Sequence, residues 1–450
     1  MPENPVVKNS ALTRSQLDRL VGEVIEEARR LGASAAEAAV SIESGLSVNV
    51  RMGEVETIEH NHDKGMGVTV YFGHAKGSAS TTDFAPQALR DAVAAACRVA
   101  KYTAEDEFAG LAEPDTLATD CPDLDLNHPW ELAPERAIEL ALECENAARA
   151  FDARIVNSEG AGVATHQAFR VYGNSHGFVG AYGGTHHSLS CAVVGKEGDS
   201  MQRDYWYTAS RLPAELESPQ QVGRLAAERT VKRLGARKLS TRQAPVLFTA
   251  DVAGSLIGGF LGAIRGGEQY RRASFLLDSL GQTVFPEFVH LCERPRLPRG
   301  YKSASFDREG VATHDRDLVR DGKVMSYVLD SYSARRLGLV STGNAGGVRN
   351  VFVETGDLDF AALLREMHTG LVVTEMIGQG LNMVTGDYSR GAAGFWVENG
   401  EVQYPVEEIT VAGNMRDMLK NIVAIGNDVD HRGNIHTGSV LLSEIAIAGD

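Results

Sequence analysis

The chain has 450 residues, more than one ordinary hydrophobic core accommodates, so two domains are expected. Its net charge of −16, with no conspicuous Lys/Arg stripe, argues against binding of nucleic acid. Apolar runs are short, and the amino terminus lacks a basic region followed by an apolar stretch, so neither a membrane span nor an export signal is expected. Five scattered cysteines, none in a C-x-x-C pair, favour a reducing cytoplasm over a disulfide framework.

The first half alternates helices with short strands. A capping box at Thr13 and Gln16 predicts a helix that ends at Gly32. Strands are then expected at 46–51, 54–60 and 67–72, with turns near Gly53 and Gly65, and at 154–160, 166–173, 177–184 and 188–195. Further helices are expected from Asp83, at 134–151, and from Ser218 to Gly235. Because 35–101 and 152–235 both contain several strands and then a helix, the pattern suggests a structural duplication.

A polar stretch near Arg237 predicts the domain boundary. The fold class expected is α+β, with residues 1–236 forming an amino-terminal domain of mixed or antiparallel strands and helices. Residues 237–450 are expected to form a mostly antiparallel β domain, with hairpin turns at Asp321-Gly322 and Asn399-Gly400. Helices are expected at 251–264 and 359–368.

Three clusters could carry chemistry. His60 and His62 lie on one side of a predicted strand and, with Asp63, could hold zinc, but a solvated strand end is the stronger interpretation. The GNSHG segment (173–177) matches the G-x-S-x-G pattern of serine hydrolases, but a strand-like segment follows it, which favours a hairpin. No histidine is directly followed by a glutamate, so no H-E-x-x-H motif occurs.

A glycine-rich segment near residue 390 offers a further candidate site. It could receive an extended peptide at a sheet edge, or form a tight turn before the Asn399-Gly400 hairpin. The candidate peptide-binding residues are Gly386, Asp387, Tyr388, Ser389, Arg390 and Gly391.

Longer segments show a family resemblance. The stretch from 386 to 414, GDYSRGAAGFWVENGEVQYPVEEITVAGN, resembles the carboxy-terminal signature of the TldD/PmbA family. Further segments are similar to its PmbA (TldE) branch: FDREGV (306–311), STGNAGG (341–347), GNSHG, RKLST (237–241) and FLLDSLG (275–281). The resemblance implies a cytoplasmic zinc-peptidase complex of two related chains, whose cavity binds unfolded peptides as extended strands and cleaves them.

The same resemblance implies that this chain is the non-catalytic subunit. In the family, the TldD-type chain carries H-E-x-x-x-H on a helix, and a cysteine nearer its carboxyl terminus completes the zinc site. The matching positions here are Gly258, Gly259 and Ala263, and the tail NIHTGSVLL (434–442) has no cysteine. Glycine and alanine side chains cannot bind a metal or move a proton, so zinc is expected only in the partner subunit. The glycines could also allow close approach of a partner helix.

These observations leave three hypotheses. The first is a subunit that forms a heterodimer with a TldD-type homologue, or a homodimer when alone, and shapes the cavity for unfolded peptides. The second is a metallopeptidase that acts by itself through His60, His62 or His436. The third is a regulatory binding protein of the gyrase-modulator type, without hydrolysis.

Overall fold

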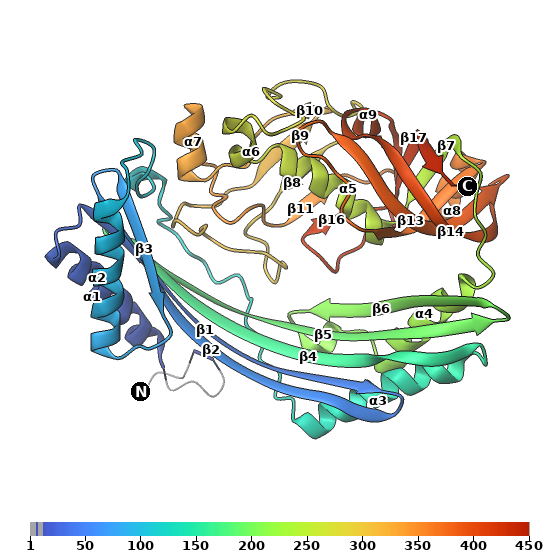
Figure 1. The fold of residues 1–450 in the computed structure, drawn as a ribbon, viewed down its shortest axis with the longest axis horizontal. Helices are drawn as coiled ribbons and strands as arrows, with labels where there is room; N and C mark the ends of the chain where they lie inside the picture. Colours follow the sequence, from blue (N-terminus) through green and yellow to red (C-terminus); the bar gives the residue numbers. More distant parts are fainter. Residues whose placement is uncertain (1–5, 8–11, 450) are drawn as a thin grey trace.

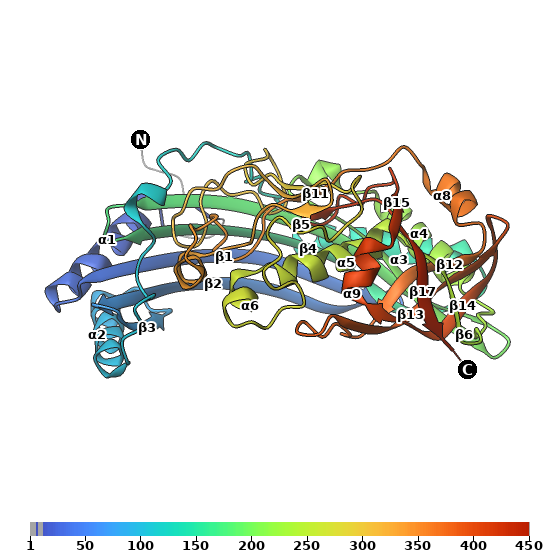
Figure 2. The same ribbon diagram turned by 90° about the horizontal axis from the view of Figure 1, so that it is seen from above.

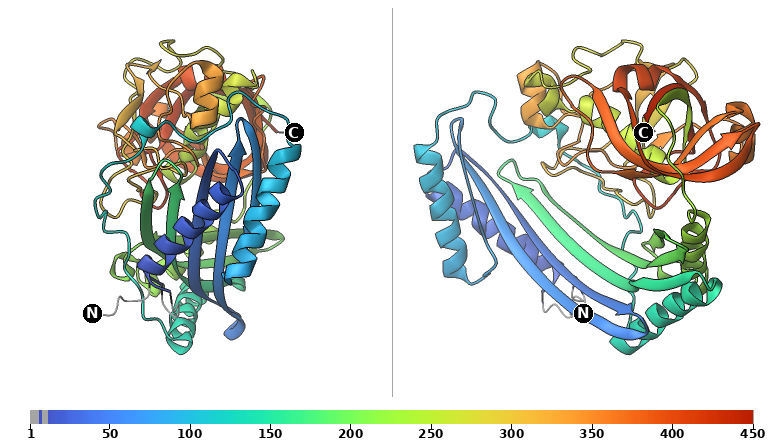
Figure 3. Two further views of the ribbon diagram at one scale, coloured as in Figure 1. Left: turned by 90° about the vertical axis from the view of Figure 1, so that its left-hand side faces the viewer. Right: turned by 45° about the vertical axis from the view of Figure 1, so that its right-hand side comes forward.

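The computed structural model describes residues 6–7 and 12–449 and shows two halves, one above the other (Figure 1). The amino-terminal half is a long curved sheet backed by helices. The carboxy-terminal half lies over the opposite face of that sheet (Figures 1 and 3). Within the described ranges, no helix combines the length and apolar character needed to cross a membrane.

Six strands form the amino-terminal sheet in the order β3-β2-β1-β4-β5-β6, and each pairs antiparallel with its neighbours. The half consists of α1 (Arg14–Arg30), β1 (Ala35–Arg51), β2 (Glu54–Phe72), β3 (Ala75–Thr81), α2 (Pro86–Tyr102), η1 (Pro114–Thr116), α3 (Pro134–Phe151), β4 (Ile155–Asn174), β5 (Val179–Glu197), β6 (Ser200–Ser210), η2 (Pro213–Glu215) and α4 (Pro219–Lys232).

The strand order confirms the expected duplication of pattern. Strands β1, β2 and β3 follow one another outward from the centre and lead into α2, whereas β4, β5 and β6 do the same and lead into α4. The two units meet where β1 pairs antiparallel with β4, for example Val40 with Val171. The capping box of Thr13 and Gln16 is also present.

The strands are longer than predicted. The turn expected near Gly65 is wrong, because β2 continues through this glycine, which pairs with Ser41 of the long neighbouring strand. Likewise, each of β4 and β5 joins two predicted strands. Between them, Asn174 to Gly177 form the turn of a hairpin, with Gly177 at φ +95°. The serine of GNSHG is therefore not on a nucleophile elbow.

The two faces of this sheet differ. Helices α1 to α4 cover one face, which carries apolar residues such as Val40, Val48 and Val163. Because side chains alternate along a strand, the intervening residues face the carboxy-terminal half.

The carboxy-terminal half contains a five-stranded sheet, β10-β9-β8-β11-β16, and a six-stranded sheet, β14-β13-β12-β7-β17-β15. Two of its pairings, β7–β12 and β11–β16, are parallel, and the others are antiparallel. Its elements are β7 (Arg242–Phe248), α5 (Ala250–Ala263), α6 (Gly266–Tyr270), β8 (Leu291–Glu293), β9 (Arg316–Arg320), β10 (Lys323–Val324), α7 (Ser331–Leu337), β11 (Val351–Val353), α8 (Phe360–Met367), β12 (Gly370–Ile377), β13 (Asp387–Glu398), β14 (Glu401–Asn414), α9 (Met415–Lys420), β15 (Ile422–Ile425), β16 (Ile435–His436) and β17 (Val440–Ala448).

Both predicted hairpin turns are confirmed. Asp321-Gly322 joins β9 to β10, and Asn399-Gly400 joins β13 to β14. All four residues have positive φ, between 50° and 77°. Two consecutive positive φ values match the right-handed twist of the flanking strands, which is why Asn-Gly and Asp-Gly are favoured at such turns.

The segment between α2 and α3 fastens the two halves together. It crosses to the carboxy-terminal half, where it meets α7 (Figures 1 and 2). Arg335 of α7 donates hydrogen bonds to the carbonyl oxygens of Phe108 (3.0 Å) and Gly110 (3.3 Å) and forms an ion pair with Glu113 (2.9 Å). The Tyr332 hydroxyl donates to Asp106 at 2.7 Å.

Candidate functional site

Helix α5 carries the three positions of the degenerate zinc motif. It packs Leu256, Ile257 and Phe260 into the core of the carboxy-terminal half. Gly258 and Gly259 are half-buried on its other sides, and Ala263 is fully buried. The apolar spacing thus fixes the orientation of the helix and leaves the glycines facing neighbouring segments.

Those neighbours are side chains of the same chain. A Cβ atom at Gly258 would lie 4.0 Å from Cδ1 of Ile435, and one at Gly259 would lie 3.1 Å from both Leu381 and Met415. At Gly262 the nearest atom is Cε of Met383, at 2.9 Å. The expectation that the glycines at the motif positions admit a partner helix is therefore wrong for Gly259, and the space beside Gly262 is also occupied by this chain.

The carboxy-terminal tail lies beside α5, but its histidine faces away. Ile435 of β16 approaches Gly258, and the next residue, His436, points to the other side of the strand. The His436 ring stacks on Phe352, with centroids 4.4 Å apart, and its Nδ1 lies 3.3 Å from Nδ1 of His431. Burial, and then the neighbouring His431, lowers the pKa of His436 to about 4.

The residues around α5 do not fit a zinc ion. Over residues 6–7 and 12–449, no three His, Cys, Asp or Glu side chains are grouped as a metal site would require. At the motif positions, the tail meets the helix through Ile435 and Gly258, neither of which can bind a metal.

His60 and His62 lie elsewhere, on an exposed part of β2. They pair with Leu46 and Ser44 of β1 and share the face that the helices cover. Asp63 points to the opposite face, so the proposed trio of two histidines and this carboxylate is wrong.

The candidate peptide-binding segment, Gly386–Gly391, has no free edge. Residues 387–391 pair with β14 on one side. On the other side, the Ser389 N–H donates to the Gly380 carbonyl at 2.8 Å, and Gly391 pairs with Ile377. A peptide strand cannot add here without displacing existing hydrogen bonds, so the prediction of edge addition at this segment is wrong. Tyr388 is buried, at 4% exposure, but Arg390 reaches a cavity.

That cavity, of about 260 Å³, lies between the two halves. It is mixed in charge: Arg229 forms ion pairs with Asp204 (3.3 Å) and Asp251 (3.2 Å), and Arg233 forms one with Glu375 (2.6 Å). The lining residues come from β6, α4, α5, β12, β13 and the tail: Asp204, Tyr205, Trp206, Tyr207, Arg229, Asp251, Val252, Ser255, Thr374, Glu375, Met376, Arg390 and Arg432.

Arg432 was not among the predicted site residues. Its guanidinium lies 4.0 Å from the Trp206 ring centroid and 4.6 Å from that of Tyr207, and it donates to the Tyr207 carbonyl at 3.3 Å. The aromatic residues at 205–207 could have indicated a cation-binding surface, because cations favour the faces of aromatic rings.

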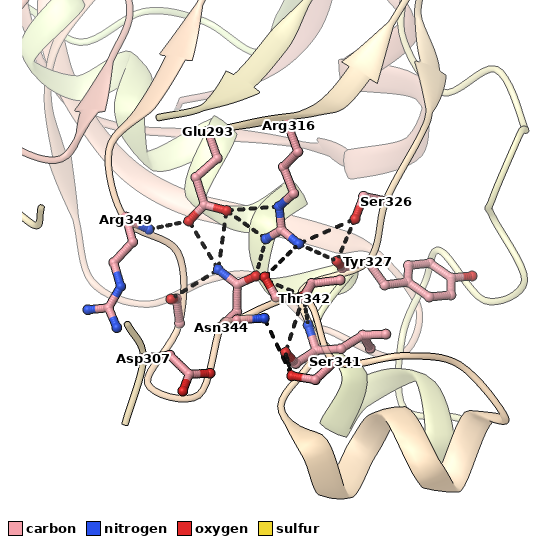
Figure 4. A network of polar contacts seen from close by, with 12 residues as sticks. Glu293, Asp307, Arg316, Ser326, Tyr327, Ser341, Thr342, Asn344 and Arg349 are labelled. Carbon is pink, nitrogen blue, oxygen red and sulfur yellow. Dashed lines mark hydrogen bonds and ion pairs between the residues drawn. The ribbon is translucent and has the colours of Figure 1, made fainter. Parts of the chain in front are cut away.

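The recognised segment STGNAGG joins Glu293 and Arg316 in a buried polar network, and Asp307 of FDREGV lies beside it (Figure 4). Glu293 receives hydrogen bonds from Arg316 (2.6 Å) and from the Asn344 amide (3.0 Å), and Thr342 donates to Asn344 at 2.8 Å. Glu293 is only 2% exposed. These segments therefore shape the interior of the carboxy-terminal half.

Of the neighbouring carboxyl groups, Asp307 is buried and Glu309 is half-buried. Burial raises the pKa of Asp307 to about 6, although the N–H groups of Ala345, Glu309 and Val311 oppose this shift. Burial and the nearby charge of Asp307 raise the pKa of Glu309 to about 7.

The architecture, two sheet-rich halves enclosing cavities, corresponds to that of a known class of metallopeptidases. Models of the PmbA/TldA metallopeptidase match over domain 1 (residues 36–100), the central domain (127–234) and the C-terminal domain (241–449). The chain belongs to the TldD/PmbA metallopeptidase family.

Curated relatives agree with this assignment. The chain is 53% identical over 414 residues to metalloprotease PmbA of Escherichia coli O157:H7, a match that covers 92% of both chains. It is 49% identical to the metalloprotease PmbA homolog of Haemophilus influenzae, with 99% of this chain and 100% of the relative covered.

Solved structures share the fold over nearly the whole chain. A protein of Bacteroides thetaiotaomicron, described as a proposed modulator of DNA gyrase, superposes with a TM-score of 0.91 at 26% identity, covering 97% of this chain and 100% of that one. TldE from Thermococcus kodakarensis gives a TM-score of 0.84 at 20% identity, with 96% and 100% covered.

Proposed function

We propose that this chain is the non-catalytic subunit of a cytoplasmic zinc-peptidase complex that cleaves unfolded peptides and small, poorly folded proteins. It pairs with a TldD-type homologue that carries the zinc, and it completes the cavity in which substrates are held. When alone, it forms a homodimer through the same surface.

The observation that carries this proposal is the composition of α5. Family membership supports peptidase chemistry, but Gly258, Gly259 and Ala263 provide neither imidazole nor carboxylate at the motif positions. The adjoining tail contributes Ile435 to this side, while His436 faces Phe352. A metal-activated water needs such ligands, so they must come from another chain.

The test is a reconstitution experiment. This chain and a TldD-type homologue are purified separately and together, and each preparation is analysed for zinc content and for cleavage of an unfolded peptide. We expect co-purification as a heterodimer, zinc in the homologue only, and full cleavage only by the mixture.

The curated relatives are named metalloproteases, which favours a second candidate, a peptidase that is active without a partner. About one zinc per chain, with EDTA-sensitive cleavage by this chain alone, would establish that function and overturn our proposal. Stable binding to a folded topoisomerase without any cleavage would instead indicate the regulatory role.

A further inference from the structure

A second cavity between the halves is lined by cations, although the whole chain is strongly acidic. It has a volume of about 260 Å³ and lies on the face of the amino-terminal sheet that the helices do not cover. His166 and Arg170 of β4 pair with His186 and Tyr182 of β5, so these side chains share that face.

The carboxy-terminal half closes the cavity with two more cations. Lys302 lies in the loop between β8 and β9 and is exposed, and the half-buried Arg349 precedes β11. No aspartate or glutamate is among the lining residues: Leu126, His166, Ala168, Arg170, Tyr182, Gly183, Gly184, Thr185, His186, Arg211, Lys302, Ser303, Ala304 and Arg349.

Not all of these cations serve the fold. Arg211 does, because it donates to the carbonyl oxygens of Thr185, Gly300 and Tyr301 at 2.6–3.0 Å. In contrast, the side chains of Arg170, Lys302 and Arg349 form no ion pair within the described part of the chain, and Nε of Arg349 is buried without a hydrogen-bond partner.

Two carboxylates lie nearby, and each has partners other than Arg170, Lys302 and Arg349. Glu43 lies 3.4 Å from Nε2 of His166. Asp307 is close to Arg349, but its oxygens accept the N–H groups of Ala345 (2.8 Å), Glu309 (2.8 Å) and Val311 (3.0 Å). The backbone N–H of Arg349 donates to Glu293, but Figure 4 shows the Arg349 guanidinium directed away from that carboxylate.

The titration behaviour of the lining groups is consistent with a positive potential. The pKa of Lys302 is lowered by burial and then by the charges of Arg349 and Arg308. The pKa of His186 is lowered by burial, and then by Arg211. Cations held together in a partly desolvated space are stabilised by a bound anion.

We infer that this cavity binds the carboxylate at the carboxyl terminus of a peptide, through Arg170, Lys302 and Arg349. The inference rests on the proposed function, since it supplies that function with a substrate preference. A peptide is favoured because Tyr182, Ala168 and the backbone of Gly183 and Gly184 add apolar and main-chain surface beside the cations. Arginine also provides paired donors that match a carboxylate.

The test measures binding by the full chain without any partner subunit, so its outcome is independent of the cleavage assay. An acetylated hexapeptide of alternating alanine and serine is titrated calorimetrically in two forms, one with a free carboxylate and one with a terminal amide. We expect the acid to bind roughly tenfold more tightly than the amide, because a charge-assisted hydrogen bond contributes a difference of about this size.

The variants Arg170→Gln, Lys302→Gln and Arg349→Gln should each reduce this preference, whereas Arg98→Gln, an exposed change of equal charge on α2, should leave it intact. The three residues lie on different segments, so if one variant fails to fold, the other two still test the binding preference. Equal binding of acid and amide would overturn the inference. Tighter binding of inorganic phosphate at the same residues would also overturn it, by assigning the cavity to phosphate.

Discussion

Glu309 is a carboxyl group whose environment predicts a pH effect on stability. Its Oε2 accepts the Ser331 N–H at 2.9 Å, and its folded-state pKa is about 7 against 4.5 for the free side chain. Because the folded pKa is raised, its contribution is complete below about pH 4.5 and is lost as the pH rises through about 7. At roughly 1.4 kcal/mol per pKa unit, the effect is on the order of 3 kcal/mol.

We therefore expect Glu309→Gln to flatten the fall in unfolding free energy between pH 5 and pH 8, as measured by urea denaturation. The glutamine carbonyl can still accept the Ser331 N–H, so the variant should fold. Glu366→Gln, at an exposed position on α8, is the matched control and should follow the wild-type profile. Parallel profiles for wild type and Glu309→Gln would contradict the prediction.

The Glu293–Arg316 pair predicts a large loss when only one partner is removed. Glu293→Ala should lower the unfolding free energy by about 3–5 kcal/mol, because it leaves a buried guanidinium uncompensated. Removing the exposed carboxylate of Glu139, which pairs with Arg136 at 2.8 Å, should cost at most about 1 kcal/mol. Denaturant titrations compare the unfolding free energies of the two variants. Similar losses would show that the Glu293–Arg316 pair does not behave as a buried ion pair.

At the scale of elements, α5 predicts different responses to the same substitution at two positions. Gly258→Ala should stabilise the protein by about 0.5–1 kcal/mol, because alanine favours a helix and its Cβ meets only Ile435 at 4.0 Å. Gly262→Ala should gain less or lose stability, because its Cβ would lie 2.9 Å from Met383. Thermal unfolding of both variants checks this order, and the reverse order would contradict the described packing.

Local chemistry also explains which elements could be predicted. The Thr13 cap and the Asn399-Gly400 turn follow from interactions among a few adjacent residues, so their prediction succeeded. The continuation of β2 through Gly65 could not be read in the same way, because it depends on pairing with β1, a distant partner. Likewise, the segment Gly386–Gly391 has no free edge because Gly380 bonds to it on one side and β14 pairs with it on the other.

At the scale of the molecule, the sequence predicted the components of the candidate site better than their assembly. Motif comparison located the window at Gly258 on α5, and the tail does lie against it. The direction of His436 depends on strand pairing with β11, and the cation cavity combines β4 and β5 with segments more than a hundred residues away. Lys302 was visible in the sequence, but nothing local indicated that it lies opposite β4 and β5.

The contact between Arg432 and β6 predicts how firmly the halves are held together. Asp430 accepts two hydrogen bonds from Arg432 at 2.9 Å, which fixes the guanidinium over Trp206 and Tyr207. Arg432→Ala should lose a partly desolvated cation–π contact and a hydrogen bond, together about 2–3 kcal/mol. We expect a red shift of tryptophan fluorescence and faster hydrogen exchange in β6, with helix and strand content retained.

Lys420→Ala, which removes an exposed cation from α9, is the matched control and should change neither signal. Arg432→Lys should fall between wild type and Arg432→Ala, because lysine keeps the charge but cannot reproduce the paired donors to Asp430. If Arg432→Ala left exchange in β6 unchanged, the segment from α2 to α3, with its contacts to Arg335 and Tyr332, would be sufficient to hold the halves together. In that event, the cavity lined by Trp206 and Arg432 would keep its shape without this contact.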